Sequence, residues 1–174
     1  MKRLCWVAAI CFSLFPSIAA AQTGSEGFEK RKTLTGDWEG SFRWTGARND
    51  FGSVQAKYYM TGMGSAIVED LTMSSRLAMT SVYHLDGTDL RMTHYCAARN
   101  QPRLKARRID VVNGILDFHF IDATNLSSSD MPHVNGVEIR WIAVDHITIR
   151  FLFDAGAAHS QELLDLKRIK QDAH

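Results

Sequence analysis

The feature that most constrains the fold is a two-residue alternation of apolar and polar side chains between Thr33 and Ile169. β-branched and aromatic residues are frequent in these segments, and turn-forming residues separate them, which is typical of β-strands. No long window shows a convincing helical stripe, although residues 160–170 are ambiguous. The pattern predicts ten strands, at residues 35–45, 53–61, 64–71, 76–85, 89–97, 104–112, 115–122, 136–144, 147–153 and 160–169.

Many short strands at a spacing of about ten residues are typical of a β-sandwich or an up-and-down β-barrel. Closing an antiparallel sheet removes its unpaired edges, so we favour the barrel and keep the sandwich as the alternative. We therefore predict an all-β protein with an antiparallel up-and-down β-barrel of about 8–10 strands. A barrel of that size can hold one small ligand in its interior.

The first 21 residues have the order of a secretory signal peptide. Lys2 and Arg3 precede a short apolar run, and Ala19 to Ala21 provide a small-residue cleavage site. This predicts a periplasmic or secreted protein, with residues 22–32 as a flexible leader and residues 33–170 as a single β-barrel domain. Cleavage removes Cys5 and Cys11, so Cys96 alone remains and an internal disulfide is excluded.

The charge and hydropathy of the chain exclude some partners. Cleavage removes Lys2 and Arg3 from the 20 basic residues and none of the 19 acidic ones, which leaves the mature chain close to neutral. A near-neutral chain has no electrostatic footprint for nucleic acid, so we expect no nucleic-acid partner. No second run of about 18 apolar residues occurs, so we expect no transmembrane segment in the mature chain. We expect a monomer or a weak oligomer.

Two hairpins allow the strand faces to be assigned. Asn113-Gly114 favours a two-residue type I′ turn, which would pair Arg107 with Phe120 and place both on the apolar face with Phe118. A charge on that face needs a partner, either a ligand carboxylate, a structural acid such as Glu69, or water at the barrel mouth. Alternation around Asp86-Gly87 places one further set of side chains in the interior: Met79, Ser81, Tyr83, Leu85, Leu90, Met92, His94 and Cys96.

The segment Leu34-Thr-Gly-Asp-Trp-Glu-Gly40 contains a G-x-W pattern on the first predicted strand. This resembles the calycin superfamily, that is, lipocalins, fatty-acid-binding proteins and their bacterial relatives, and the chain is similar to lipocalin-like exported bacterial proteins of uncharacterised type. The resemblance implies that Trp38, flanked by Gly36 and Gly40, is a structural plug at one barrel end. G-x-W-x-G also resembles the opening of the haem-binding nitrobindin family, in which a histidine near the last strand binds haem. His159 has that place in this chain, although its spacing does not match cleanly.

The leading hypothesis is non-covalent binding of a small hydrophobic or amphipathic molecule in the barrel interior, anionic if Arg107 is its anchor. His94 and Cys96 share a face, but their spacing does not place the thiol against the imidazole, so we assign no catalytic residue. We also assign no metal site and no resident cofactor, with haem as an alternative. A barrel with a filled core that acts through its surface is the other alternative. The candidate ligand-binding residues are Tyr83, Met92, His94, Cys96, Arg107, Phe118 and Phe120.

Overall fold

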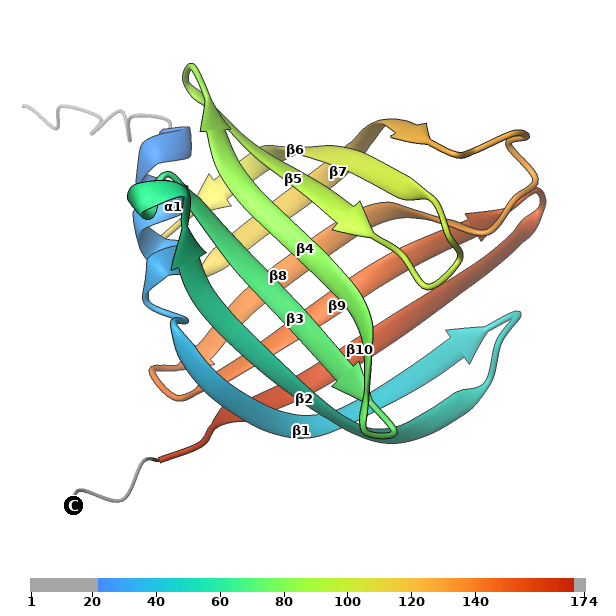
Figure 1. Cartoon of the computed structure of the whole chain (residues 1–174), viewed down its shortest axis with the longest axis horizontal. Helices are drawn as coiled ribbons and strands as arrows, with labels where there is room; N and C mark the ends of the chain where they lie inside the picture. The colour runs from blue at the N-terminus through green and yellow to red at the C-terminus, as the bar shows by residue number, and fades with distance from the viewer. Residues whose placement is uncertain (1–21, 171–174) are drawn as a thin grey trace, which may run out of the picture.

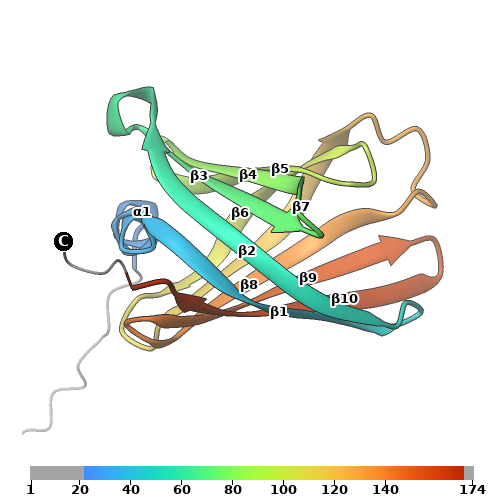
Figure 2. The same ribbon diagram turned by 60° about the horizontal axis from the view of Figure 1, so that its bottom comes forward.

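The computed structural model describes residues 22–170, which form a closed antiparallel β-barrel with one short helix at one end (Figures 1 and 2). The predicted all-β barrel and its ten strands are confirmed. The predicted signal peptide lies outside the described residues. The elements are α1 (Gly24–Lys32), β1 (Gly36–Gly46), β2 (Asp50–Thr61), the 3-10 turn η1 (Gly62–Gly64), β3 (Ala66–Met73), β4 (Arg76–Asp86), β5 (Asp89–Tyr95), β6 (Gln101–Asp110), β7 (Ile115–Thr124), β8 (His133–Ala143), β9 (His146–Ala155) and β10 (Ala158–Arg168).

Closure of the sheet takes place along β1. Each strand pairs with its neighbours in sequence, and β1 pairs with both β2 and β10, for example at Trp38↔Ala56 and Gly40↔Leu166. The closed order excludes the sandwich alternative. At Gly40 the strands approach so closely that a Cβ atom would lie 1.8 Å from the carbonyl oxygen of Asp165. Only glycine fits such an approach, which explains the second glycine of the G-x-W-x-G pattern.

The segment 22–32 was wrongly predicted to be a flexible leader, since most of it forms α1. Thr23 caps the helix in a capping box with Glu26, which satisfies free N–H groups of the first turn. The helix packs against the β4–β5 hairpin, where a Cβ atom on Gly24 would lie 2.2 Å from the carbonyl oxygen of Thr88. Phe28 and Arg31 are buried, so α1 covers one end of the barrel (Figure 2). Within residues 22–170, no helix is long and apolar enough to cross a membrane.

Trp38 is fully buried at the α1 end of the barrel. Its indole Nε1 donates a 2.7 Å hydrogen bond to the carbonyl oxygen of Leu34, directly after α1. The Arg168 guanidinium lies 4.3 Å from the centre of the indole ring and donates to the carbonyl oxygens of Thr33 and Thr35. These contacts join the last strand to the link between α1 and β1. They close this end of the barrel without a disulfide.

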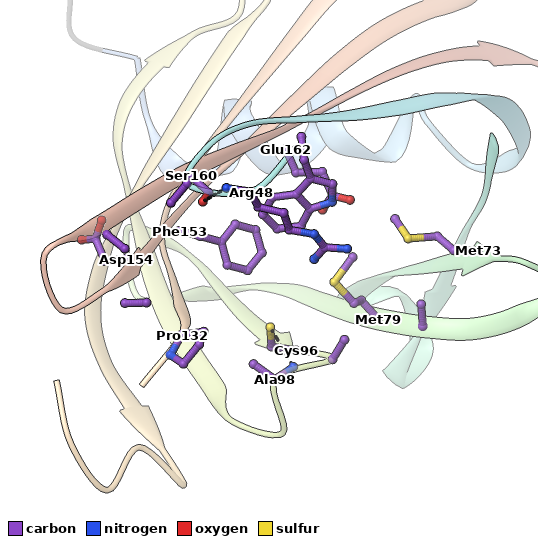
Figure 3. Close-up of a pocket in the computed structure, with 16 residues that line it drawn as sticks. Arg48, Met73, Met79, Cys96, Ala98, Pro132, Phe153, Asp154, Ser160 and Glu162 are labelled. Carbon is purple, nitrogen blue, oxygen red and sulfur yellow. Dashed lines mark hydrogen bonds between the residues drawn. The ribbon is translucent and has the colours of Figure 1, made fainter. Parts of the chain in front are cut away.

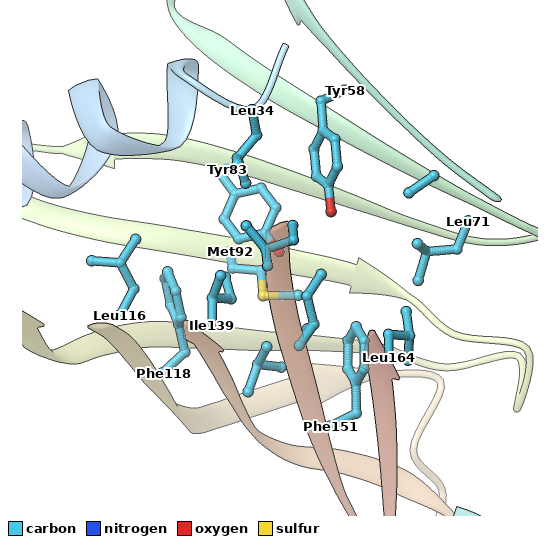
Figure 4. Packing of buried hydrophobic residues seen from close by; sticks show 14 of the residues in the cluster. Leu34, Tyr58, Leu71, Tyr83, Met92, Leu116, Phe118, Ile139, Phe151 and Leu164 are labelled. Carbon is cyan, nitrogen blue, oxygen red and sulfur yellow. The ribbon is translucent and has the colours of Figure 1, made fainter. Parts of the chain in front are cut away.

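Apolar side chains fill the barrel between α1 and the middle of the strands. Figure 4 shows Tyr83, Met92, Phe118 and Phe151 of the strands packed together with Leu34, which lies between α1 and β1. The predicted face of the β4–β5 hairpin is confirmed by the pairs Tyr83↔Met92 and Ser81↔His94, although Leu85 at its end is exposed. This half of the interior is a packed core.

The register predicted for the β6–β7 hairpin was wrong. The strands pair at Asp110↔Ile115 across a four-residue turn, because the Asp110 carboxylate accepts hydrogen bonds from the backbone N–H and the side-chain amide of Asn113. A register shift between Ala106 and Arg108 adds a residue to β6. Such a bulge redirects a side chain, and Arg107 points outward instead of into the barrel.

A buried ion pair fastens α1 to the barrel. Arg31 Nη2 lies 2.7 Å from Glu69 Oε2, and both side chains are fully buried. The same carboxylate accepts hydrogen bonds from the Tyr83 hydroxyl at 3.3 Å and the Ser81 hydroxyl at 3.4 Å. The Arg31 guanidinium also lies 3.8 Å from the centre of the Tyr83 ring. Glu69 is therefore an interior carboxylate whose charge is compensated by the helix.

We predict that Arg31→Met lowers the free energy of unfolding by about 3–5 kcal/mol, because it leaves the Glu69 carboxylate buried without its cation. Urea unfolding followed by tryptophan fluorescence measures the loss. The double variant Arg31→Met/Glu69→Gln removes both charges and serves as the control. A double variant that is less stable than Arg31→Met would contradict the explanation.

Candidate functional site

The end of the barrel opposite α1 contains a cavity of about 480 Å³ (Figure 3). Its wall is largely apolar and comes from the ends of β1, β3, β4, β9 and β10 and from the segment after β5. Small residues there leave the volume unfilled. The lining residues are Trp44, Ala47, Arg48, Met73, Ala78, Met79, Cys96, Ala97, Ala98, Pro132, Phe153, Asp154, Ala155, Ala158, Ser160 and Glu162.

Two aromatic rings and two thioethers form the larger surfaces of the cavity. The rings of Trp44 and Phe153 have their centres 4.7 Å apart at an angle of 47°. Met73 and Met79 approach from β3 and β4, as Figure 3 shows. Thioethers are polarizable and adapt to irregular apolar shapes. The wall therefore suits a flat or branched apolar group.

Glu162 is the buried charged residue of the cavity wall. It lies on β10 opposite Trp44 of β1 and Phe151 of β9, at an interior position of the alternation that continues with Leu164. Neither carboxylate oxygen has a well-formed hydrogen bond among residues 22–170, although the Trp44 side chain lies close enough to interact with the carboxylate. Burial raises the pKa of Glu162 to about 7, while the nearby Arg48 guanidinium and Trp44 indole oppose the shift. The carboxyl group is thus harder to ionise than an exposed glutamate.

Arg48 lies at the rim of the cavity, in the turn between β1 and β2. Its guanidinium carbon lies 4.0 Å from the centre of the Trp44 ring, and Nη2 lies 3.1 Å from Asp50 Oδ2. The side chain is 54% exposed. Figure 3 shows it extending across the cavity toward Met79. Arg48 therefore covers part of the cavity but is held only by surface contacts.

Cys96 lines the cavity, but its thiol is not activated. Burial raises the pKa of the thiol, and the backbone N–H of Ala98 donates a 3.4 Å hydrogen bond to its Sγ. His94 Nδ1 lies 3.0 Å from the Ser81 hydroxyl, and burial lowers the pKa of the imidazole to about 4. The two side chains share a face without forming a thiolate–imidazole pair. Cys96 acts as a small apolar side chain of the wall.

The other predicted ligand-binding residues do not line the cavity. Tyr83, Met92, His94 and Phe118 belong to the packed half of the interior, and Phe120 is half-buried against the His133 ring at 5.2 Å.

The interior position predicted for Arg107 was wrong. Its side chain is 64% exposed, and its Nε donates a 2.8 Å hydrogen bond to Asp117. The structural acid suggested for it, Glu69, binds Arg31 instead. The reason for expecting an anionic ligand is thereby removed.

His159 lies on the rim outside the cavity wall. It is 72% exposed, and its Nδ1 lies 2.6 Å from Asp154 Oδ1. Within residues 22–170, no group of three or more His, Cys, Asp and Glu side chains is arranged to hold a metal ion. The sequence interpretation missed Glu162, Trp44 and Phe153 as neighbours in one site. The available signal was the alternation Ser160, Glu162, Leu164, Leu166, which places a carboxylate on the interior face.

The comparisons with known proteins address the fold. No family model matches the chain, and no curated protein matches it. A crystal structure of a protein of unknown function from the DUF3598 family of Nostoc punctiforme is similar, with a TM-score of 0.56 and 15% sequence identity. The match covers 80% of this chain and 49% of that protein, so the chain spans about half its length. The similarity shows a shared barrel fold, which fits a calycin-like architecture.

We predict that Glu162→Gln increases the free energy of unfolding at pH 8. The raised pKa means that the folded protein keeps a proton that the unfolded chain loses between about pH 4.5 and pH 7, so wild-type stability falls across this range. The variant lacks this titration, and its advantage should grow by about 1–3 kcal/mol from pH 4.5 to pH 8. Urea unfolding of both proteins at the two pH values measures it. A difference that does not change with pH would refute the raised pKa.

Proposed function

We propose that the protein binds a small, largely apolar molecule non-covalently in the cavity at the open end of the barrel. The observation that carries the proposal is the cavity itself, whose volume of about 480 Å³ lies within the range of small-molecule sites. Its predominantly apolar wall with few polar groups is typical of such sites. The ring surfaces of Trp44 and Phe153 would supply most of the apolar contact.

The packing along the barrel favours a ligand-binding protein over the alternative, a barrel with a filled interior that acts only through its outer surface. The half next to α1 is packed with large side chains, whereas many small side chains contribute to the wall of the other half. Six alanines line the cavity: Ala47, Ala78, Ala97, Ala98, Ala155 and Ala158. Protein interiors are normally close-packed, and an unfilled volume forfeits packing energy. An occupant would restore those contacts.

The compartment is part of the proposal. The basic and apolar order of residues 1–21 supports export to the periplasm or beyond. An exported binding protein of this kind would meet small molecules outside the cytoplasm. Among residues 22–170 the single cysteine, Cys96, forms no disulfide, and the closed sheet and the Trp38–Arg168 contacts hold the barrel together without one.

We predict that the neutral fluorescent probe N-phenyl-1-naphthylamine binds the mature protein with a blue-shifted, enhanced emission. Ala78→Phe places a ring in the cavity and should weaken binding at least tenfold, which corresponds to about 1.4 kcal/mol. Ala143→Phe makes the same change at an exposed position at the α1 end and should leave the affinity unchanged. Fluorescence titration of the three proteins measures this. Equal affinities for the wild type and Ala78→Phe would place the probe elsewhere and contradict the proposed site.

A further inference from the structure

The two buried acidic side chains among residues 22–170, Glu69 and Glu162, are treated differently by the fold. Glu69 lies toward the α1 end and receives the Arg31 guanidinium and two hydroxyl groups. Glu162 lies in the wall of the cavity, and within residues 22–170 neither of its oxygens has a well-formed hydrogen bond, with only the Trp44 side chain and the Arg48 guanidinium nearby. A buried carboxylate needs a cation or several hydrogen-bond donors. A hydrogen-bond donor for Glu162 could be supplied by a molecule in the cavity.

The groups around the cavity favour a positive rather than a negative occupant. Its lining carries the carboxylates of Glu162 and Asp154 against the single guanidinium of Arg48. Asp154 is already bound to His159 and Asn135, and Arg48 contacts Asp50. The face of Trp44 holds one cation, Arg48, and aromatic faces of this kind attract cations in general. A ligand carboxylate or phosphate placed at Glu162 would meet like charge in a poorly solvated site. An ammonium group would meet the opposite charge.

We propose that the occupant of the cavity is an organic amine, with an apolar body against Trp44 and Phe153 and a protonated ammonium group bound by the Glu162 carboxylate. This inference rests on the proposed function, because it names the class of molecule that the same cavity binds. The ammonium would donate hydrogen bonds to the two oxygens that are unpaired. The fold thus satisfies Glu69 with its own arginine and leaves Glu162 for a ligand.

Arg48 defines the route to Glu162. Its side chain lies over Trp44 and across the cavity, and we infer that an entering ammonium displaces it. The exposed ion pair with Asp50 is a weak restraint, because solvent screens both partners. Arg48 is therefore a movable cover, and the ligand replaces one cation near Glu162 with another.

The proposal implies a pH dependence with a definite sign. The groups that act on Glu162 are Arg48, Trp44 and Asp50. The Glu162 carboxylate in turn raises the pKa of the Cys96 thiol, and the Asp154–His159 pair lies at the rim. With the pKa of Glu162 at about 7, the ionised fraction rises about tenfold between pH 6 and pH 8. An amine that stays protonated in this range should therefore bind about tenfold more tightly at pH 8. A neutral ligand of the same shape should not follow this profile.

Three naphthalene probes of similar size test the proposal by isothermal titration calorimetry on the mature protein. They are 1-naphthalenemethylamine, the neutral 1-naphthalenemethanol and the anionic 1-naphthoate. At pH 8 the amine should bind at least tenfold more tightly than the alcohol, and the carboxylate more weakly than either. Glu162→Gln should abolish the preference for the amine and its pH dependence but retain binding of the alcohol. Glu39→Gln, the same change at an exposed position on β1, should keep the preference.

The outcomes separate this inference from the proposed function. Equal affinities of the wild type for the amine and the alcohol, or an amine preference that survives Glu162→Gln, would overturn the amine inference while leaving the cavity as a binding site. Failure of all three naphthalenes and of N-phenyl-1-naphthylamine to bind would overturn the proposed function and the inference with it. Loss of the amine preference in Glu162→Gln, with the preference kept in Glu39→Gln, would support both the proposed function and the amine inference.

Discussion

Closure of the sheet is the constraint on which the rest of this structure depends. Once β1 pairs with both β2 and β10, alternate side chains of every strand point into an interior from which water is largely excluded. Most of these positions hold apolar residues, but two hold glutamates. Each of these has to find a compensating group inside the barrel or remain a source of instability. The two outcomes, Arg31 paired with Glu69 and a carboxylate without a well-formed hydrogen bond at Glu162, distinguish a packed end of the barrel from the end that contains the cavity.

The structural end is built from pieces that lie far apart in the sequence. Helix α1 brings Arg31 to Glu69 on β3, and Arg168 at the end of β10 stacks on Trp38 of β1. The two contacts pin the beginning and the end of the barrel to each other. Large side chains fill this end, whereas alanines and other small residues contribute to the wall at the other end, where the sheet still closes. The cavity exists because the large interior side chains gather at the α1 end and leave volume unfilled at the other end.

The sequence could predict the strands and the barrel because alternation and edge closure are local and topological constraints. It could not predict the orientation of Arg107, because a bulge in β6 and the hydrogen bonds of Asp110 override the two-residue turn that Asn113-Gly114 favours. Helix α1 was missed although Thr23 and Glu26 form a recognisable capping box, since Phe28 is its only large apolar side chain. Glu162 was obscured by the adjacent Leu163 and Leu164, which blur the alternation of the last strand.

The unfavourable burial of the Glu162 carboxyl group bears on the role of the open end of the barrel. Its neighbours on the same face, Leu164 and Leu166, show what a barrel strand uses when only packing matters. A leucine at position 162 would continue that face, and it would avoid a carboxyl group whose pKa is raised by burial to about 7. Sites that hold unsatisfied groups give up stability in exchange for interactions made with a ligand. If the proposed amine binds at Glu162, its occupancy of the cavity would compensate this carboxylate and so couple binding to the stability of the fold.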